Sequence, residues 1–341
     1  MKIGLKLNSQ FPTGEDVVKG VQELVEQVEA ARDAGFHSVW VSQHYLAAPY
    51  QALQTWPLLG RIAGVAGEMQ VGTSIFLLPL HNPVYAAEQS ATLDVITGGR
   101  FVFGVGLGYR PEEFAAFGVE LDDRVGRFVE SLEVVRRLWT EDVVDHHGRF
   151  FTLEGATLTL KPVQRPHPPI WVAASGDPGV QRAGRLGLPW LVNPHASLSG
   201  IERQFALYRE ALEASGHEPP ADFPVFKEFA IAPTHAEAVR TARPYLKGKY
   251  ESYAKWGLDK PMPEEERLDR AFEELARDRF IIGSPEECVA ELFRHEEAVG
   301  ANHFLLRMQW PGMPQERVLE EIALVGAEVI PVVSGTVDED R

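Results

Sequence analysis

The segment Val71–Val119 constrains the fold of this chain most, because it places one helix pattern between two strand patterns. The strand patterns cover Val71–Leu78 and Arg100–Val105. The helix between them ends at Gly98-Gly99, a typical C-cap. The second strand runs into Gly106-Leu107-Gly108, so glycines stand at the carboxyl end of a strand, where α/β proteins bind ligands. The segment therefore predicts a β–α–β unit with a ligand site at its strand ends.

Strand patterns of this kind alternate with amphipathic helices along the whole chain. They cover Ile3–Leu7, Ser38–Ser42, Val71–Leu78, Arg100–Val105, Ile170–Ala174, Trp190–Asn193, Val225–Ala232 and His303–Arg307. Repeated βα units imply parallel strands, and eight such strands imply a closed (β/α)₈ TIM barrel. We therefore expect an α/β protein with a single barrel domain over residues 1–333. The polar tail over residues 334–341 is expected to be disordered.

Two segments interrupt the alternation. Gly148–Leu160 predicts a hairpin before the fifth strand, with Glu154-Gly155 at its turn. Glu237–Arg277 is long, charged and helical in pattern. We expect it to be an insertion between the seventh and eighth strands, over one end of the barrel.

Composition limits the partners of the chain. The formal net charge of −16 disfavours nucleic acid and anionic membrane surfaces. No apolar run approaches the ~20 residues that a membrane span needs. The sequence MKIGLKLN leads directly into a strand and has no signal-peptide pattern, so we expect a cytoplasmic protein. The one cysteine, Cys288, excludes an internal disulfide and fits a helix face.

Polar residues at the strand ends are the first candidates for a site, because active sites of barrels lie at the carboxyl ends of the strands. His44 ends the second strand, where a neutral imidazole can act as a base or hydrogen-bond an anion. A bond to a loop carbonyl would explain His44 equally well. Arg307 ends the eighth strand, and an arginine there usually meets an anion or a carboxylate. The same rule selects Asn8, Ser74, Gly106, Ser175 and Asn193.

The turn after the fifth strand is a candidate phosphate site. Ser175-Gly176-Asp177 precedes a helix pattern, and backbone amides at a helix start suit a phosphate. An ordinary turn with Asp177 as the N-cap is the alternative. The sequence has no His-Glu-x-x-His or clustered-cysteine motif, so we do not expect a metal site.

Other candidates concern a flat ligand and the pocket walls. Gly106 and Gly108 leave room for a flat ligand against the backbone. Thr73-Ser74 could form a ledge at the end of the third strand, or be a simple polar strand end. Several large apolar residues could line a substrate pocket or belong to the core. They are Phe11, Phe76, Trp190, Met308 and Trp310.

Several segments, taken in order, resemble the bacterial luciferase-like, flavin-dependent monooxygenase family. They are VWVSQHY, VGTSIFLLPLHNPVYAAEQSATLDVITGGRFVFGVGLG, PPIWVAASGDPGVQRAGRLGLP and AVGANHFLLRMQWPG. The resemblance implies a (β/α)₈ barrel that binds a reduced flavin at the strand ends. It matches His44 to the active-site histidine, and Thr73-Ser74-Ile75 to a segment with a non-prolyl cis peptide behind the flavin ring. It matches Ser175 and Gly176 to the phosphate turn.

The chain departs from the family at one point. Luciferase has a Cys-Arg pair where this chain has Gly106-Leu107, which leaves backbone amides or Arg110 to hold the flavin phosphate. The resemblance implies a two-component monooxygenase. It would take reduced FMN from a separate flavin reductase and oxygenate a small organic substrate with O₂ through a C4a-peroxide that His44 stabilises. The alternatives are an F420-dependent dehydrogenase or reductase, which needs no O₂, and a flavin-binding barrel without turnover.

Small residues on two helices suggest self-association. The helices near Trp56–Ala66 and Val84–Ile96 carry Ala63, Gly64, Ala66, Ala86, Ala87, Ser90 and Ala91. Small residues allow helices to approach closely, and relatives in the family dimerise through this side of the barrel. We therefore predict a two-fold homodimer centred on these helices. The alternative is that the small residues pack on the barrel's own strands.

Overall fold

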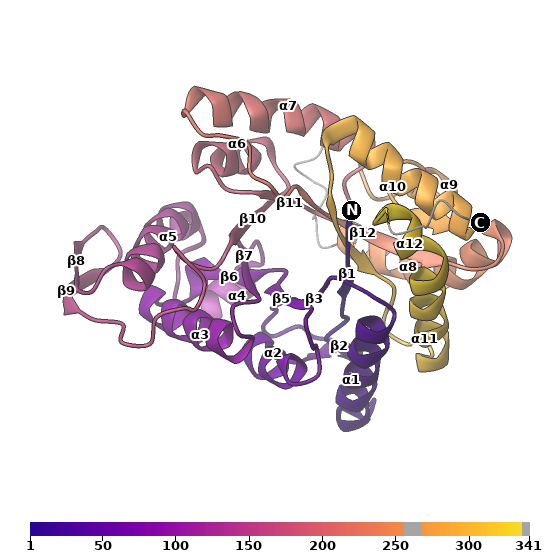
Figure 1. Ribbon diagram of the computed structural model, residues 1–341, viewed down its shortest axis with the longest axis horizontal. Helices are drawn as coiled ribbons and strands as arrows, with labels where there is room; N and C mark the ends of the chain where they lie inside the picture. Colours follow the sequence, from indigo (N-terminus) through magenta and orange to yellow (C-terminus); the bar gives the residue numbers. More distant parts are fainter. Residues whose placement is uncertain (256–266, 336–341) are drawn as a thin grey trace.

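A computed structural model describes residues 1–255 and 267–335 of the protein (Figure 1). Its eight parallel strands close into a barrel surrounded by helices, which confirms the predicted fold. Around the ring the strands are β1 (Lys2–Lys6), β3 (Ser38–Val41), β5 (Gln70–Thr73) with its continuation β6 (Phe76–Leu77), β7 (Phe101–Gly106), β10 (Ile170–Ala174), β11 (Trp190–Val192), β12 (Pro224–Ile231) and β14 (His303–Arg307). The ring closes where β14 pairs with β1, for example Leu306 with Leu5.

The third barrel strand is broken, whereas the sequence predicted one strand over Val71–Leu78. The break falls between β5 and β6, where the Ser74–Ile75 peptide bond is cis, as the resemblance implied. Thr73 Oγ1 donates a hydrogen bond to the carbonyl of Gly104 on β7, 2.7 Å away. A Cβ on Gly106 would lie only 2.0 Å from Ile75 Cδ1. The Ile75 side chain therefore occupies the space that the glycine leaves open.

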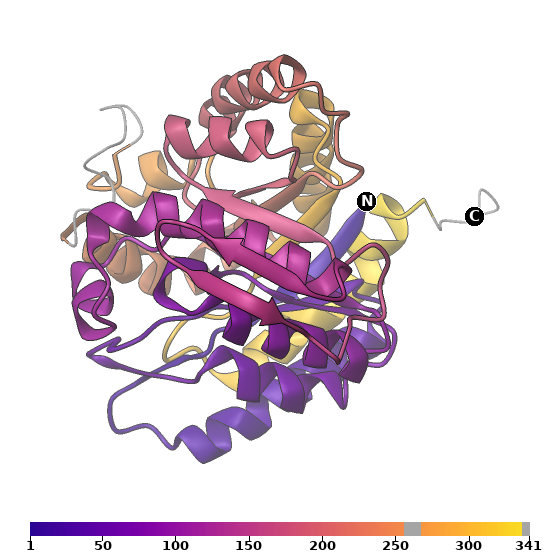
Figure 2. The ribbon, with the colours of Figure 1, turned by 90° about the vertical axis from the view of Figure 1, so that its left-hand side faces the viewer.

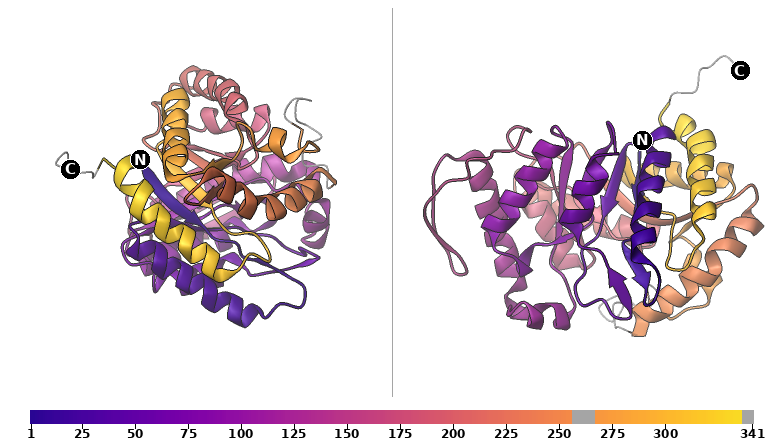
Figure 3. Two further views of the ribbon diagram at one scale, coloured as in Figure 1. Left: turned by 90° about the vertical axis from the view of Figure 1, so that its right-hand side faces the viewer. Right: turned by 90° about the horizontal axis from the view of Figure 1, so that it is seen from below.

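An outer layer of helices covers the barrel (Figures 1 and 3). These are α1 (Val17–Asp33), α2 (Thr55–Ala63), α3 (Pro83–Ile96), α4 (Pro111–Ala116), α5 (Arg124–Thr140), α6 (Asp177–Arg185), α7 (Leu198–Ala214), α8 (His235–Lys255), α9 (Phe272–Ala276), α10 (Pro285–Val299), α11 (Gln315–Leu324) and α12 (Ile330–Val333). Helix α1 shows why the layer forms: Leu24, Val28 and Ala31 recur at helical spacing and are fully buried. The N-terminal amine donates to the carbonyl of Val333, so β1 starts beside α12, as Figure 3 shows.

The predicted hairpin is present, but its turn was placed wrongly. Strands β8 (Val144–His147) and β9 (Thr152–Ala156) are antiparallel, and the turn lies over residues 148–151. The Glu130 carboxylate on α5 accepts the backbone N–H groups of Phe150 and Phe151, which holds the turn at that point. Gly155 instead lies inside β9 with a φ of +58°, opposite a register irregularity. Figure 2 shows the hairpin on the outside of the molecule, over α5.

The segment between β12 and β14 is mainly helical, as expected, but it also contains a strand. Helices α8 and α9 fall within the predicted insertion, and residues 256–266 lie outside the described residues. Strand β13 (Ile281–Gly283) pairs in parallel with β12. It was not predicted, because three residues are too few to show the alternation of apolar and polar side chains that indicates a strand. A second small antiparallel pair, β2 (Gln10–Pro12) and β4 (Tyr50–Ala52), connects two loops at the carboxyl ends of the strands. Most of the predicted polar tail, residues 336–341, also lies outside the described residues.

The small residues predicted at an interface on α3 face the interior of the chain, whereas Ala63 is half-buried and Gly64 is exposed at the end of α2. Ala86, Ala87, Ser90 and Ala91 have no exposed surface within the single chain. The indole N–H of Trp139 on α5 donates to the Ala87 carbonyl, 3.2 Å away. These residues let α3 approach α5 and the barrel, which was the alternative interpretation. The outer face of α3 exposes four larger apolar residues instead: Val84, Tyr85, Val95 and Ile96.

Candidate active site

A cavity of about 340 Å³ opens at the carboxyl ends of β1, β3, β7 and β14 and is bounded on one side by α8. Five residues that the sequence selected line this cavity: Asn8, His44, Arg110, Arg307 and Trp310. The carboxyl ends of the barrel strands therefore surround a cavity, and His44 lies in its wall. Lys6, Tyr109, Tyr245 and Lys249 line it as well.

His44 is paired with a buried carboxylate. Its Nδ1 lies 3.4 Å from Oε1 of Glu113, a residue of α4 that is almost fully buried. Burial alone would raise the pKa of Glu113, but hydrogen bonds from His44 and from the backbone N–H of Tyr45 outweigh it and lower the pKa. An ionised Glu113 accepts the Nδ1 proton and leaves Nε2 of His44 as the atom that can take or give a proton.

Arg110 holds the loop that carries His44. Its guanidinium donates to the carbonyls of Tyr45 and Leu46, at 2.9 and 3.2 Å, and lies 3.4 Å from Glu113. This position is beside the histidine, so Arg110 fixes the loop geometry from the cavity wall. The sequence suggested Arg110 as a possible phosphate ligand, and in the structure its donors serve these three acceptors.

A second wall of the cavity carries Lys249, Arg307 and Trp310, and all three contact a buried carboxylate behind this wall. Glu228 on β12 stands opposite Arg307 on β14 in the strand register, with 3.3 Å between the carboxylate and the guanidinium. Lys249 on α8 also pairs with this carboxylate, and the indole N–H of Trp310 donates to it at 2.7 Å. These contacts, with Lys249 and Arg307 nearby, lower the pKa of Glu228 although burial acts to raise it. The carboxylate is therefore ionised beneath the cavity wall.

The candidate phosphate turn lies after β10, at the start of α6. Ser175 and Gly176 are exposed, and Gly176 is the N-cap of the helix. Asp177 does not cap the helix, contrary to one interpretation of the sequence. Its carboxylate binds Arg203 at 2.7 Å and Gln204 at 2.9 Å. No side chain caps the start of α6, and the N–H groups of Gly179 and Val180 both donate to the carbonyl of Gly176.

Several predicted pocket residues belong to the core instead. Phe11, Phe76, Trp190 and Met308 are buried in the main hydrophobic cluster between the strands and the helices. Phe76 stacks against His81, and the indole of Trp190 donates to the carbonyl of Ala174. Asn193 is half-buried and accepts the backbone N–H of His195, so it shapes a turn. On β11, Trp190 packs in this outer cluster, whereas its neighbour Leu191 belongs to the interior cluster of the barrel.

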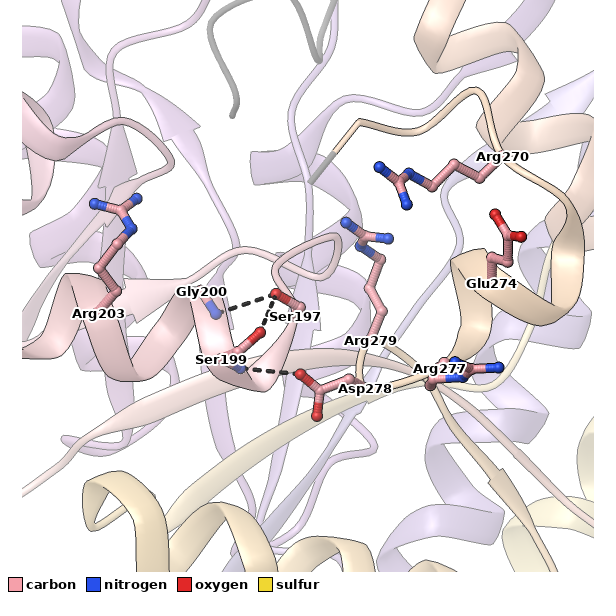
Figure 4. Close-up of a pocket in the computed structure, with 9 residues that line it drawn as sticks. All are labelled: Ser197, Ser199, Gly200, Arg203, Arg270, Glu274, Arg277, Asp278 and Arg279. Carbon is pink, nitrogen blue, oxygen red and sulfur yellow. Dashed lines mark hydrogen bonds between the residues drawn. The ribbon is translucent and has the colours of Figure 1, made fainter. Parts of the chain in front are cut away.

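A second hollow, of about 660 Å³, lies between the start of α7 and the segment around α9 (Figure 4). Four arginines line it: Arg203, Arg270, Arg277 and Arg279. Figure 4 shows Arg270 and Arg279 close together and Arg277 turned away from them. Arg279 is almost fully buried and donates to the carbonyl of His195 at 2.7 Å. Arg203 also pairs with Asp177, so the hollow is adjacent to the candidate phosphate turn.

Sequence reasoning missed four charged residues: Lys6 and Lys249, which line the main cavity, and Glu113 and Glu228, which lie behind its wall and pair with residues that line it. The signal for Lys6 and Glu228 was present, because each is a charge inside an otherwise apolar strand pattern. In the sequence, Glu113 is an acidic residue in the first turn of a helix, where such residues are common. Its burial depends on tertiary contacts and could not be predicted. Over residues 1–255 and 267–335, no cluster of metal-binding side chains and no helix able to cross a membrane occurs.

The parallel barrel, the cavity at its strand ends and the histidine–carboxylate pair define a barrel enzyme. The luciferase-like monooxygenase family model matches residues 1–303, so the chain belongs to this family and is an oxidoreductase. The chain is 28% identical over 339 residues to an F420-dependent glucose-6-phosphate dehydrogenase of Amycolatopsis mediterranei, covering 95% of this chain and 96% of that protein. It is 27% identical over 349 residues to 4-hydroxyprotoasukamycin monooxygenase of Streptomyces nodosus subsp. asukaensis, covering 99% and 94%. The solved structure of the monooxygenase RslO1 from Streptomyces bottropensis is 25% identical, with a TM-score of 0.81 and coverage of 97% and 99%.

Proposed function

We propose that this protein is the oxygenating component of a two-component flavin monooxygenase in the cytoplasm. It would bind reduced FMN supplied by a separate flavin reductase and use O₂ to oxygenate a small organic substrate. The observation that carries the proposal is the His44–Glu113 pair in the wall of a cavity at the strand ends. The similar monooxygenase sequence of Streptomyces nodosus supports this choice of chemistry.

The residues present fit a bound flavin. Ile75 and Gly106 meet at the carboxyl ends of two neighbouring strands, where Ile75 can support one face of a flat ring. The start of α6, which no side chain caps, suits the phosphate. Arg182 on α6 adds positive charge near this turn, because its guanidinium lies 3.9 Å from the position a Cβ on Gly179 would take. It would replace the arginine that the chain lacks at Leu107.

Bound reduced FMN would supply the electrons that activate O₂. In this scheme, His44 holds a proton at Nε2 and donates it to, or accepts it from, the reacting oxygen. Glu113 keeps His44 in the Nδ1–H tautomer and stabilises its protonated form. Arg110 holds the loop that carries His44, and the aromatic side chains of Tyr109, Tyr245 and Trp310 limit water in the cavity.

Flavin titration tests this proposal. Reduced FMN should raise the melting temperature of the purified protein under anaerobic conditions, because ligand binding to the folded state stabilises it. When O₂ is then admitted, the protein should delay the release of hydrogen peroxide relative to free reduced FMN. Immediate peroxide release at the rate of free flavin would contradict a monooxygenase.

The second candidate is an F420-dependent dehydrogenase or reductase, which would transfer a hydride without O₂. The arginine-lined hollow of Figure 4 favours it, because the acidic polyglutamyl tail of F420 would find a cationic surface there. The F420-dependent relative of Amycolatopsis mediterranei agrees with this candidate. An increase in melting temperature with F420 but not with reduced FMN would favour the F420-dependent enzyme over the monooxygenase.

We also propose that the protein is a homodimer that uses the outer face of α3. Tyr85 and Ile96 on this face are 44% and 55% exposed, and with Val84 and Val95 they place four exposed apolar side chains on one helix. Apolar surface gathered in one patch is typical of interaction sites. Because a two-fold axis brings the same patch of both copies together, one apolar face is sufficient for such a contact. Light scattering that reports 37.9 kDa at working concentrations would exclude the dimer.

A further inference from the structure

We propose that Gln43 is a positioning residue that fixes His44 relative to the flavin, because it links the backbone around Ile75 to the hydroxyl of Tyr45. The inference rests on the proposed function, in which Ile75 supports the flavin ring and His44 transfers a proton. It goes beyond that function because it assigns a role in the reaction to a buried glutamine.

The first step is the attachment of Gln43 to the segment that carries Ile75. The backbone N–H of Gln43 donates to the Ile75 carbonyl at 3.1 Å. The side-chain Oε1 of Gln43 accepts the backbone N–H of Leu77 on β6 at 2.8 Å. The side chain is only 3% exposed, so these hydrogen bonds are shielded from water. Gln43 is therefore fixed to the segment that would support the flavin ring.

The second step is the direction of the hydrogen bonds at Tyr45. Because Oε1 of Gln43 accepts a backbone N–H, the other side-chain atom is the amide nitrogen, which donates to the Tyr45 hydroxyl at 2.9 Å. The hydroxyl proton is then directed to Nε2 of His81, 3.2 Å away. Burial lowers the pKa of His81 to about 4, so its ring is neutral and can accept this proton at Nε2. The phenol is thus held by a donor and by an acceptor.

The third step extends from Tyr45 to His44. The backbone N–H of Tyr45 donates to Oε1 of Glu113 at 2.9 Å, and the same oxygen lies 3.4 Å from His44 Nδ1. The Tyr45 carbonyl accepts from Arg110, and the Tyr45 ring packs on Phe117 with 4.5 Å between the ring centroids. A rotation of the phenol would displace the peptide that joins Tyr45 to His44 and would misalign the imidazole with Glu113. The hydrogen bonds to the phenol oppose this rotation.

Gln43 matters because the flavin support and His44 belong to different strands of the barrel. His44 follows β3, whereas Ile75 lies between β5 and β6. The regular pairing of β3 with β5 ends at Val41 and Thr73, and Gln43 continues the contact beyond this point. Proton transfer depends strongly on distance, and a misplacement of about 1 Å can reduce a rate about a hundredfold. Gln43 therefore keeps the imidazole at a fixed distance from the ring support.

The experiment compares Gln43→Leu and Tyr45→Phe with the wild-type full chain. The first variant removes both side-chain hydrogen bonds of Gln43, and the second removes only the phenol hydroxyl. Each protein is loaded with reduced FMN and mixed with O₂, and hydrogen peroxide is measured per bound flavin. We expect both variants to bind reduced FMN nearly as well as the wild type and to release peroxide about tenfold faster, because His44 is misaligned. Tyr45→Phe keeps the inference testable if Gln43→Leu does not fold.

A second measurement needs no flavin. Nitrogen NMR of the histidine side chains in the apo-protein reports which ring nitrogen carries the proton, with signals assigned from single-histidine variants. We expect His81 to be unprotonated at Nε2. Gln43→Leu should shift the His44 signals and leave those of the exposed His217 unchanged. A substitution that only lowered stability would leave the His44 signals of the folded protein in place.

A double variant tests whether Gln43 acts through Tyr45. Since both substitutions break the same link, Gln43→Leu combined with Tyr45→Phe should release peroxide no faster than Gln43→Leu alone. Gln51→Leu is the matched control. Gln51 is an exposed glutamine on β4 that donates to the carbonyls of Pro12 and Glu15, and its substitution should leave peroxide release and the His44 signals unchanged.

Four outcomes would overturn the inference. They are wild-type peroxide release in both single variants, a loss of FMN affinity as large as the increase in release rate, unchanged His44 signals in Gln43→Leu, and effects that multiply in the double variant. Failure of the proposed function is distinct, because it appears in the wild-type protein as an absence of flavin binding or of any delay in peroxide release. The NMR comparison would then still report whether Gln43 positions His44.

Discussion

The Nδ1 atom of His44 lies 3.4 Å from Oε1 of Glu113, and the loop and the helix that carry these residues meet only in the folded barrel. His44 follows β3, whereas Glu113 lies in α4, after β7. Glu113 also accepts the backbone N–H of Tyr45, the residue next to the histidine. One buried carboxylate therefore fixes both the loop and the tautomer of the imidazole. A carboxylate in this position acts on the reaction through the histidine, as a positioning residue.

Substitution of Glu113 tests this relationship. Glu113→Gln should lower turnover about tenfold or more, less than the loss of about a hundredfold expected for His44→Ala, which removes the proton-transfer group. Steady-state assays and a flavin titration measure turnover and flavin affinity separately. Glu112→Gln, at the exposed neighbour, is the control, and parallel loss of flavin binding and turnover would assign Glu113 to folding or to the cofactor pocket.

The turn at Gly176 offers a test of phosphate binding. A Cβ at Gly176 would meet only the Pro178 ring, at 3.9 Å, and its φ of −99° suits any residue. Gly176→Val should therefore leave the stability of the apo-protein nearly unchanged. It should weaken FMN more than riboflavin, because the valine blocks the approach of the phosphate to the α6 amides. Comparison of the two affinities by fluorescence titration measures this, and equal weakening would place the phosphate elsewhere.

The sequence was most informative where strands are long and least informative where short elements meet. The barrel strands were predictable because their apolar runs are bounded by turn residues, and this also located His44, Arg307 and Trp310 at the mouth. The inward or outward direction of Phe76 and Trp190 was not predictable, because strands of two and three residues show no alternation. The partners of His44 and Arg307 depend on tertiary contacts, since Glu113 and Glu228 are 69 and 79 residues away.

The two faces of α3 should respond differently to the same substitution. Ala87→Arg places a charge in a fully buried site beside Trp139 and should destabilise the chain by about 3 kcal/mol or more. Tyr85→Arg changes the exposed face, and it should leave the monomer fold intact while weakening the proposed dimer. Thermal melts and light scattering on both variants separate the effects. Retention of the dimer in Tyr85→Arg would move the interface to another face.

Glu321 on α11 predicts a pH dependence of stability that is independent of the active site. Burial raises its pKa to about 8, although Arg317 acts in the opposite direction, and the backbone N–H of Ile231 donates to its carboxylate at 3.4 Å. Between about pH 4.5, the ordinary pKa of a glutamate, and about pH 8, the folded chain therefore keeps a proton on Glu321 that the unfolded chain has lost. Over this interval the free energy of unfolding falls as the pH rises, and above about pH 8 the effect of Glu321 becomes constant. Glu321→Gln keeps the shape without the ionisation, so urea denaturation should show a gain in stability that is larger at about pH 8.5 than at about pH 5. Glu320→Gln, at the exposed neighbour, should show no such gain, and an equal response of the two variants at both pH values would contradict a protonated Glu321.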